Sequence, residues 1–105
     1  MSKAPMKTAS DCLTRAAQLV GGDRETTHGA KAENFANIAA VWNGILQAAG
    51  KAGDVPLDGH DVANLMEGMK IARRYSGAFN GDDYVDGGGY AGCAFEVKKA
   101  LIHGG

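Results

Sequence analysis

Two acids in the last third of the chain are the residues whose spacing first suggests chemistry. Asp83 and Asp86 are three residues apart, so in a helix they project from the same side of one turn. Glu67, Lys70 and Arg73 precede them, also in steps of three. Carboxylates bind Mg²⁺ through hard oxygen ligands, and Lys and Arg hold phosphate oxygens. This order of acids and bases predicts a site where a divalent cation and a phosphate meet.

Each of these residues also has a structural explanation. Acids in the first turn of a helix, such as Asp83, offset the helix dipole, and Glu33 at the start of an earlier helix can do the same. Glu67 and its basic neighbours can form a solvated stripe of weak pairs. We keep both interpretations. In the functional one, Glu33, Glu67, Asp83 and Asp86 are the metal ligands and the catalytic acids.

A polar loop ahead of the second expected helix supplies further candidates. It carries Thr27 and His28, and polar loops between rigid helices often bind ligands, although a lone loop histidine is more often just exposed. We expect Thr27, His28 and Tyr90 to lie near the ligand, with Lys70 and Arg73 on its phosphate.

Three consecutive glycines, residues 87–89, stand where the pattern predicts the interior of a helix. Each glycine there costs about 0.8–1 kcal/mol relative to alanine. Such a cost indicates that something approaches the helix closely, either another helix or a ligand.

Apolar residues recur every three to four positions almost throughout, which is the helical period. Helices are expected over 10–20, 32–49, about 58–75 and about 82–102, the first capped by Ser10 or Asp11. We therefore predict an all-α fold, a small antiparallel bundle of about four helices. The chain reads as one domain, 1–105, with tails at 1–9 and 103–105. The expected core comprises Phe35, Ile38, Trp42, Leu65, Met69 and Tyr90.

Composition narrows the class of protein. Eleven Lys and Arg against twelve Asp and Glu give a net charge of −1, which is no signal for nucleic-acid binding. No apolar run approaches the ~20 residues of a membrane helix. Cys12 and Cys93 have no metal-ligand spacing and fit a reducing compartment, so we expect a cytoplasmic protein. Four short helices leave apolar surface to spare, which predicts a homodimer.

The chain resembles a group of small, uncharacterised phage and prophage proteins over about residues 10–95. The motifs that carry this resemblance are Thr27–Gly29, Glu33–Phe35, Lys70–Arg73 and Asp83–Ala91. More distantly, it is similar to the phage nucleotide-modification-associated domains and to the all-α nucleotide pyrophosphohydrolases of the MazG type. Their acid-x-x-Asp pattern is matched by Asp83 and Asp86. In that superfamily these carboxylates hold Mg²⁺ beside a triphosphate.

The same superfamily carries paired glutamates on a preceding helix, and this chain has no Glu-Glu-x-x-Glu motif. No Walker phosphate loop, dinucleotide glycine fingerprint, His-Glu-x-x-His or Cys-x-x-Cys occurs either. Any catalysis is therefore expected to depend on a metal held by carboxylates. The leading hypothesis is a phage-type helical protein that binds a phosphorylated nucleotide, with Mg²⁺-dependent hydrolysis as an extension. Its rivals are an accessory protein that binds a host or defence protein, and a nucleotide-sequestering protein without turnover.

Overall fold

The computed structural model describes residues 5–21 and 30–103, and these form four helices. The helices are α1 (Ala9–Val20), α3 (Lys31–Ala48), α4 (Gly59–Arg73) and α5 (Gly81–Ile102). No strand occurs in the described part of the chain, which confirms the all-α prediction. The helix bounds agree with the expected ones to within two residues. None of the described helices is long and apolar enough to cross a membrane.

Two helices begin with capping boxes, in which a side chain at the helix start and the third helical residue satisfy each other's backbone N–H groups. At α1 the cap is Thr8, whose hydroxyl accepts from the N–H of Asp11 at 3.1 Å, so the expected cap at Ser10 or Asp11 is wrong. At α4 the carboxylate of Asp58 accepts from the N–H of Asp61 at 2.9 Å. These backbone hydrogen bonds lower the pKa of the Asp58 carboxyl, and those from Lys7 and Thr8 lower that of Asp11.

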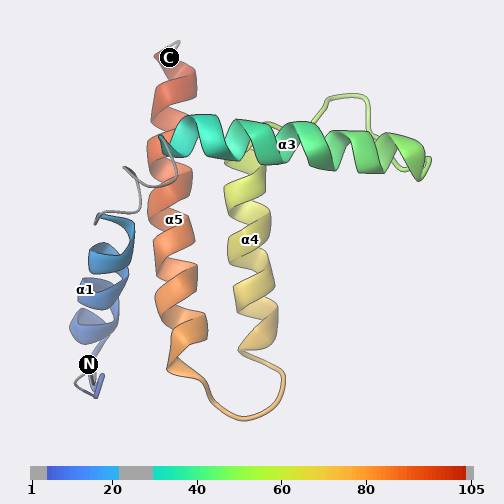
Figure 1. Cartoon of the computed structure of the whole chain (residues 1–105). Coiled ribbons are helices and arrows are strands. Elements are labelled where there is room, and N and C mark those ends of the chain that lie inside the picture. Colours follow the sequence, from blue (N-terminus) through green and yellow to red (C-terminus); the bar gives the residue numbers. More distant parts are fainter. Residues whose placement is uncertain (1–4, 22–29, 104–105) are drawn as a thin grey trace.

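The four helices form a hairpin with one helix alongside it and one helix across it (Figure 1). Helices α4 and α5 run antiparallel, joined by the turn at residues 74–80. Helix α1 lies along the first half of α5, on the side away from α4. Helix α3 crosses the hairpin near the start of α4, and its second half extends beyond α4. The long helix α5 is thus the element that all the others contact or approach.

The core lies where α3 crosses the hairpin. Its buried members come from α3, α4 and α5: Phe35, Ala39, Val62, Ala63, Cys93, Ala94 and Val97. Ile38, Trp42 and Tyr90 are partly buried against this cluster, as expected for residues of the inward stripes.

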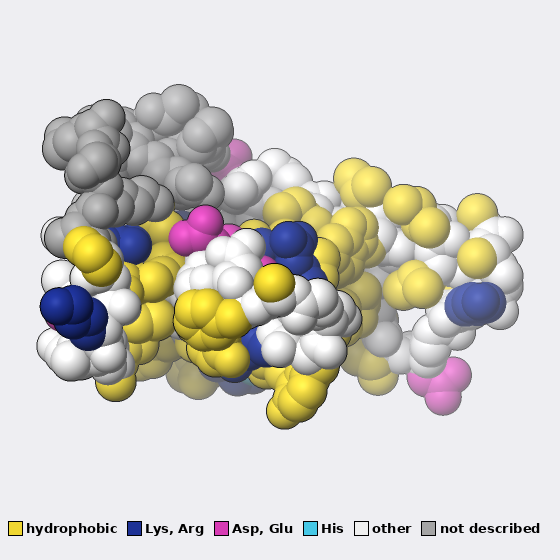
Figure 2. Space-filling model, turned by 90° about the horizontal axis from the view of Figure 1, so that it is seen from below, with side chains coloured by type: hydrophobic (Ala, Val, Ile, Leu, Met, Phe, Trp, Pro, Cys, Tyr) yellow, Lys and Arg dark blue, Asp and Glu magenta, His cyan; other side chains and the backbone are white. Residues whose placement is uncertain are grey.

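The expectation that Leu65 and Met69 belong to the core is wrong, because they remain 50% and 44% exposed. Helix α4 turns Val62, Ala63 and Met66 toward its neighbours, and no described element covers its opposite flank. Exposed apolar side chains also follow α3 beyond the hairpin, as Figure 2 shows.

Close packing of α1 explains two of the three consecutive glycines. A Cβ on Gly88 would lie 3.4 Å from the Cβ of Ala16, and one on Gly89 would lie 3.2 Å from Cγ1 of Val20. Larger side chains at these positions would push α1 away from α5. Of the two interpretations of the triplet, close helix packing therefore holds for Gly88 and Gly89.

Candidate functional site

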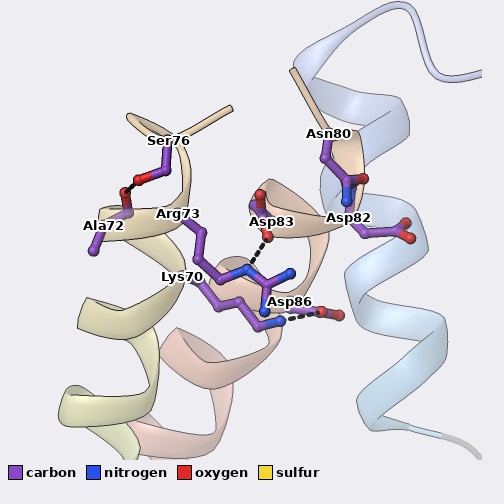
Figure 3. Close-up of polar contacts among 8 residues, drawn as sticks. All are labelled: Lys70, Ala72, Arg73, Ser76, Asn80, Asp82, Asp83 and Asp86. Carbon is purple, nitrogen blue, oxygen red and sulfur yellow. Dashed lines mark hydrogen bonds and ion pairs between the residues drawn. The ribbon is translucent and has the colours of Figure 1, made fainter. Parts of the chain in front are cut away.

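Two ion pairs join α4 and α5 next to the hairpin turn (Figure 3). Lys70 Nζ lies 3.0 Å from Oδ2 of Asp86, and Arg73 Nε lies 3.2 Å from Oδ1 of Asp83. Antiparallel packing across a short turn predicts this approach of the two basic residues to the two acids, and the structure confirms it. Asn80 Oδ1 starts α5 by accepting from the N–H of Asp82 at 3.0 Å.

The burial of the two pairs differs. The Asp83 side chain is 7% exposed, and its Oδ1 has no aligned hydrogen bond although Arg73 Nε is within ion-pair distance. We take this contact as electrostatic, since a hydrogen bond requires alignment as well as distance. Arg73 itself is largely exposed, whereas Lys70 is mostly buried against the hairpin. Both basic side chains that were expected to bind phosphate are therefore already occupied by carboxylates.

Glu33 does not lie beside these two acids. It lies exposed in the first turn of α3, where Lys31 Nζ contacts Oε1 of Glu96 at 3.7 Å. Asp86 is about 15 Å from Glu96 along α5, at 1.5 Å per residue. The crossing of α3 near the far end of the hairpin separates Glu33 from Asp83 and Asp86 (Figure 1).

The four expected metal ligands, Glu33, Glu67, Asp83 and Asp86, do not form a preformed Mg²⁺ site. Among the described residues, the group with three ligand atoms within 4.8 Å of one another is instead Asp58, His60 and Asp61. The carboxylates of that group already accept the backbone N–H groups of the α4 capping box, which explains their proximity. The residues present therefore do not fit the expected metal centre.

The remaining expected ligand contacts are placed as follows. Tyr90 packs against the core cluster, so its ring is committed to packing. Thr27 and His28 lie outside the described residues.

A pocket of about 670 Å³ lies between α1, the hairpin turn and the first half of α5. Most of its lining is apolar, contributed by Met6, Cys12, Leu13, Phe79 and Tyr84. Seen from below in Figure 2, hydrophobic side chains face one another between the α1 side and the turn. The predicted N-terminal tail is thus partly engaged, because residues 6–8 line this pocket.

Arg74 is the central polar residue of the pocket. Its guanidinium carbon lies 4.5 Å from the centroid of the Tyr84 ring, a cation–π contact. The ring of Phe79 lies 5.8 Å from that of Tyr84 and continues the aromatic surface. A Cβ on Gly87 would overlap the Arg74 guanidinium, so the first glycine of the triplet makes room for this side chain.

The Arg74 guanidinium retains hydrogen-bonding capacity, because its buried Nε has no acceptor among the described residues. A buried donor without an acceptor costs about 1–3 kcal/mol, and more on a charged group. Arg74 was not among the ligand residues expected from the sequence. Two features of the sequence could have pointed to Arg74 as a ligand residue. It follows Glu67 by seven residues, which places both on one face of the helix, and Gly87 leaves room for its side chain.

The charge around the pocket favours an anion. Among the described lining residues, Lys7 and Arg74 are basic and Glu67 alone is acidic. The first residues of α1 and α5, Ala9 and Gly81, line it as well, so both helices begin at the pocket. Helix N-termini carry partial positive charge and exposed N–H groups. The pocket thus combines an aromatic wall with several groups that attract negative charge.

Neither Lys70 nor Asp86 lines the pocket, although Lys70 lies next to Gly87, which does. At 3.6 residues per turn, Tyr84 and Asp86 are separated by about 200° around α5. Glu67 lines the pocket, whereas Asp83 and Asp86 face Arg73 and Lys70. Glu67 therefore faces the pocket while the two aspartates pair outside it, so these three acids do not converge on one ligand.

Comparison with known proteins places the chain in a family. Residues 11–98 match a family described as a domain of unknown function, DUF6378. The gene 55 protein of Mycobacterium phage D29 is 36% identical over 92 residues, which cover 88% of this chain and 56% of the relative. The gene 55 protein of Mycobacterium phage L5 is 38% identical over 80 residues, covering 76% and 47%. No solved structure matches significantly. The chain spans about half the length of these two phage relatives, and it belongs to the DUF6378 family.

Proposed function

We propose that this phage-type helical protein binds a phosphorylated nucleotide in the pocket between α1, α4 and α5. The observation that carries the proposal is Arg74, a guanidinium stacked on an aromatic ring whose buried Nε has no acceptor in the described structure. Its setting calls for a ligand that combines a planar ring with an anionic group. The resemblance to nucleotide-handling phage proteins adds the chemical class.

The pocket suits the two parts of a nucleotide. Its volume of about 670 Å³ lies within the ~300–1,000 Å³ typical of small-molecule sites. The Tyr84 and Phe79 rings offer a surface for stacking a base, worth about 1–3 kcal/mol. Arg74 and Lys7, together with the N-termini of α1 and α5, attract the phosphate groups.

Hydrolysis has less support than binding. Among the described residues that line the pocket, Glu67 is the one carboxylate, and the other expected catalytic acids lie elsewhere. When bound, Mg²⁺ would supply charge neutralisation of the phosphates, but no step of binding by this chain's own residues requires it. Mg²⁺-dependent pyrophosphohydrolysis of the MazG type stays a prediction. Binding without turnover, as in a nucleotide-sequestering protein, needs only the groups that line the pocket.

A thermal-shift and calorimetric screen of nucleoside triphosphates, with and without Mg²⁺, tests the proposal. A ligand at 100 times its Kd adds about 2.7 kcal/mol of apparent stability, which raises the melting temperature by roughly 10–20 °C in a domain this small. Tyr84→Ala should weaken binding about 10- to 100-fold through lost stacking. Arg74→Met should weaken nucleoside triphosphate and inorganic triphosphate alike.

Asp86→Asn is the matched control, since it alters an ion pair neither of whose members lines the pocket. It should leave nucleotide affinity unchanged. If Asp86→Asn abolishes binding while Arg74→Met does not, the ligand sits at the ion pairs and the pocket assignment is wrong. If no nucleotide stabilises the folded parent protein, the nucleotide proposal fails altogether.

A second candidate function is that of an accessory protein that binds a host or defence protein without catalysis. The exposed apolar side chains of Val41 and Ile45 on α3 favour it, because large uncovered apolar patches often mark protein-interaction sites. The nucleotide screen separates this candidate from the first, since a protein-binding face on α3 requires no ligand in the pocket.

A further inference from the structure

The second half of α3 has the uncharged composition of a buried helix, yet its apolar side chains are exposed. Residues 34–50 contain no Asp, Glu, Lys or Arg. Phe35 and Ala39 on the first half pack into the core. Farther along, Val41 and Ile45 are 61% and 60% exposed, four residues apart and therefore on one face. A helix without charge is normally enclosed by other protein.

The second half of α3 extends beyond α4 (Figure 1), and the chain is less compact than is usual for its length. The radius of gyration is 15.4 Å, whereas a compact chain of this length has about 13 Å. The accessible surface is 7337 Å² for 10.8 kDa, against about 5,500 Å² for a typical folded monomer of that mass. The exposed apolar side chains of Val41 and Ile45 on α3 contribute to this excess.

We propose that the exposed face of α3 packs against α3 of a second copy of this chain. Interface centres are depleted of charged residues, and pairing two α3 helices brings together two charge-free surfaces. A two-fold axis through that contact makes the patch self-complementary, so Val41 and Ile45 of each copy cover those of the other. This inference goes beyond nucleotide binding and does not depend on it, because the pocket lies at the opposite end of the hairpin from α3 (Figure 1).

A second copy fits this face better than a charged partner. An interface built on residues 34–50 offers no ion pair to a partner's Lys, Arg, Asp or Glu, and such groups would be buried unpaired. Residues 34–50 of a second copy bring no charged side chain to the contact. The same stretch holds Trp42, the chain's single tryptophan, which is half-buried and one residue from Val41. Because Trp42 is only partly buried against the core cluster, a second copy on α3 should also change its fluorescence.

Size-exclusion chromatography with light scattering tests the proposal. The parent chain should have twice the 10.8 kDa monomer mass at high micromolar concentration and approach the monomer mass on dilution. Over the same range the Trp42 emission should shift to longer wavelength. Ile45→Glu should give a monomer at every concentration, because it places two facing carboxylates in an apolar contact. Phe95→Glu is the matched control on α5, at a residue 69% exposed, and should remain a dimer.

Two results would overturn the proposal. One is a parent chain that stays monomeric at millimolar concentration, which would assign the α3 face to a different protein or to a further segment of a longer chain. The other is an Ile45→Glu protein that keeps both its helical circular dichroism and the dimer mass. If Ile45→Glu does not fold, Val41→Lys and the concentration dependence of the parent decide the matter. Nucleotide binding by the monomeric variant should equal that of the parent.

Discussion

Replacing individual glycines of α5 by alanine measures how closely α1 approaches that helix. At Gly92 an added Cβ meets nothing within 4 Å, so Gly92→Ala should gain about 0.8–1 kcal/mol of helix propensity. At Gly89 the added Cβ would lie 3.2 Å from Cγ1 of Val20, closer than ordinary contact. Overpacking of this kind costs about 1–3 kcal/mol. Gly89→Ala should therefore be neutral to destabilising by about 2 kcal/mol, and the two variants should differ by about 1–3 kcal/mol.

Urea unfolding followed by far-ultraviolet circular dichroism gives this difference, and melting temperatures provide a second reading. In a domain of this size each kcal/mol corresponds to roughly 4–8 °C. Gly88→Ala should keep most of the propensity gain, since its Cβ would meet Ala16 at an ordinary 3.4 Å. The reasoning is refuted if Gly89→Ala stabilises the protein as much as Gly92→Ala does. In that case α1 does not pack on α5 as the structure places it.

Two further variants test the cap and the core. Asp58→Ala removes the acceptor for the Asp61 N–H and should cost about 1 kcal/mol at pH 7. Because folding lowers the pKa of the Asp58 carboxyl from 3.8, its contribution is present above pH 4 and disappears as the pH falls below that value, so the parent and the variant should converge in urea titrations near pH 2. Phe35→Ala empties the centre of the core and should cost about 3–5 kcal/mol, seen as a large drop in the urea midpoint; a loss under 1 kcal/mol would contradict its central position.

The sequence predicts the helices well because their signals are local. Apolar periodicity and the acids, asparagines and glycines at the ends mark each boundary, as at Asp58 and Asn80. The approach of Lys70 to Asp86 is also local, since a short turn between antiparallel helices fixes which residues meet. These features need no knowledge of how distant segments pack.

Apart from the cap of α1, which is Thr8 and not Ser10 or Asp11, the errors concern packing between distant segments. Periodicity identifies an apolar face on α4 but not whether another helix covers it, so Leu65 and Met69 were expected in the core and are half-exposed. The angle at which α3 crosses the hairpin places Glu33 far from Asp83, and no spacing in the sequence encodes that angle. Arg74 was missed because its importance comes from Tyr84 and Gly87 on the neighbouring helix α5.

The modest burial of α1 has a consequence for dynamics. Of the residues of this helix, Ala16 alone is buried, so α1 is held to α5 by little apolar area. Elements with few buried contacts detach in local unfolding well below the free energy of global unfolding. The pocket exists only while α1 is docked, because α1 supplies one wall of it. Amide hydrogens of α1 should therefore exchange faster than those in the α4–α5 hairpin. A ligand bound in the pocket should slow this exchange, because it contacts α1 and α5 together.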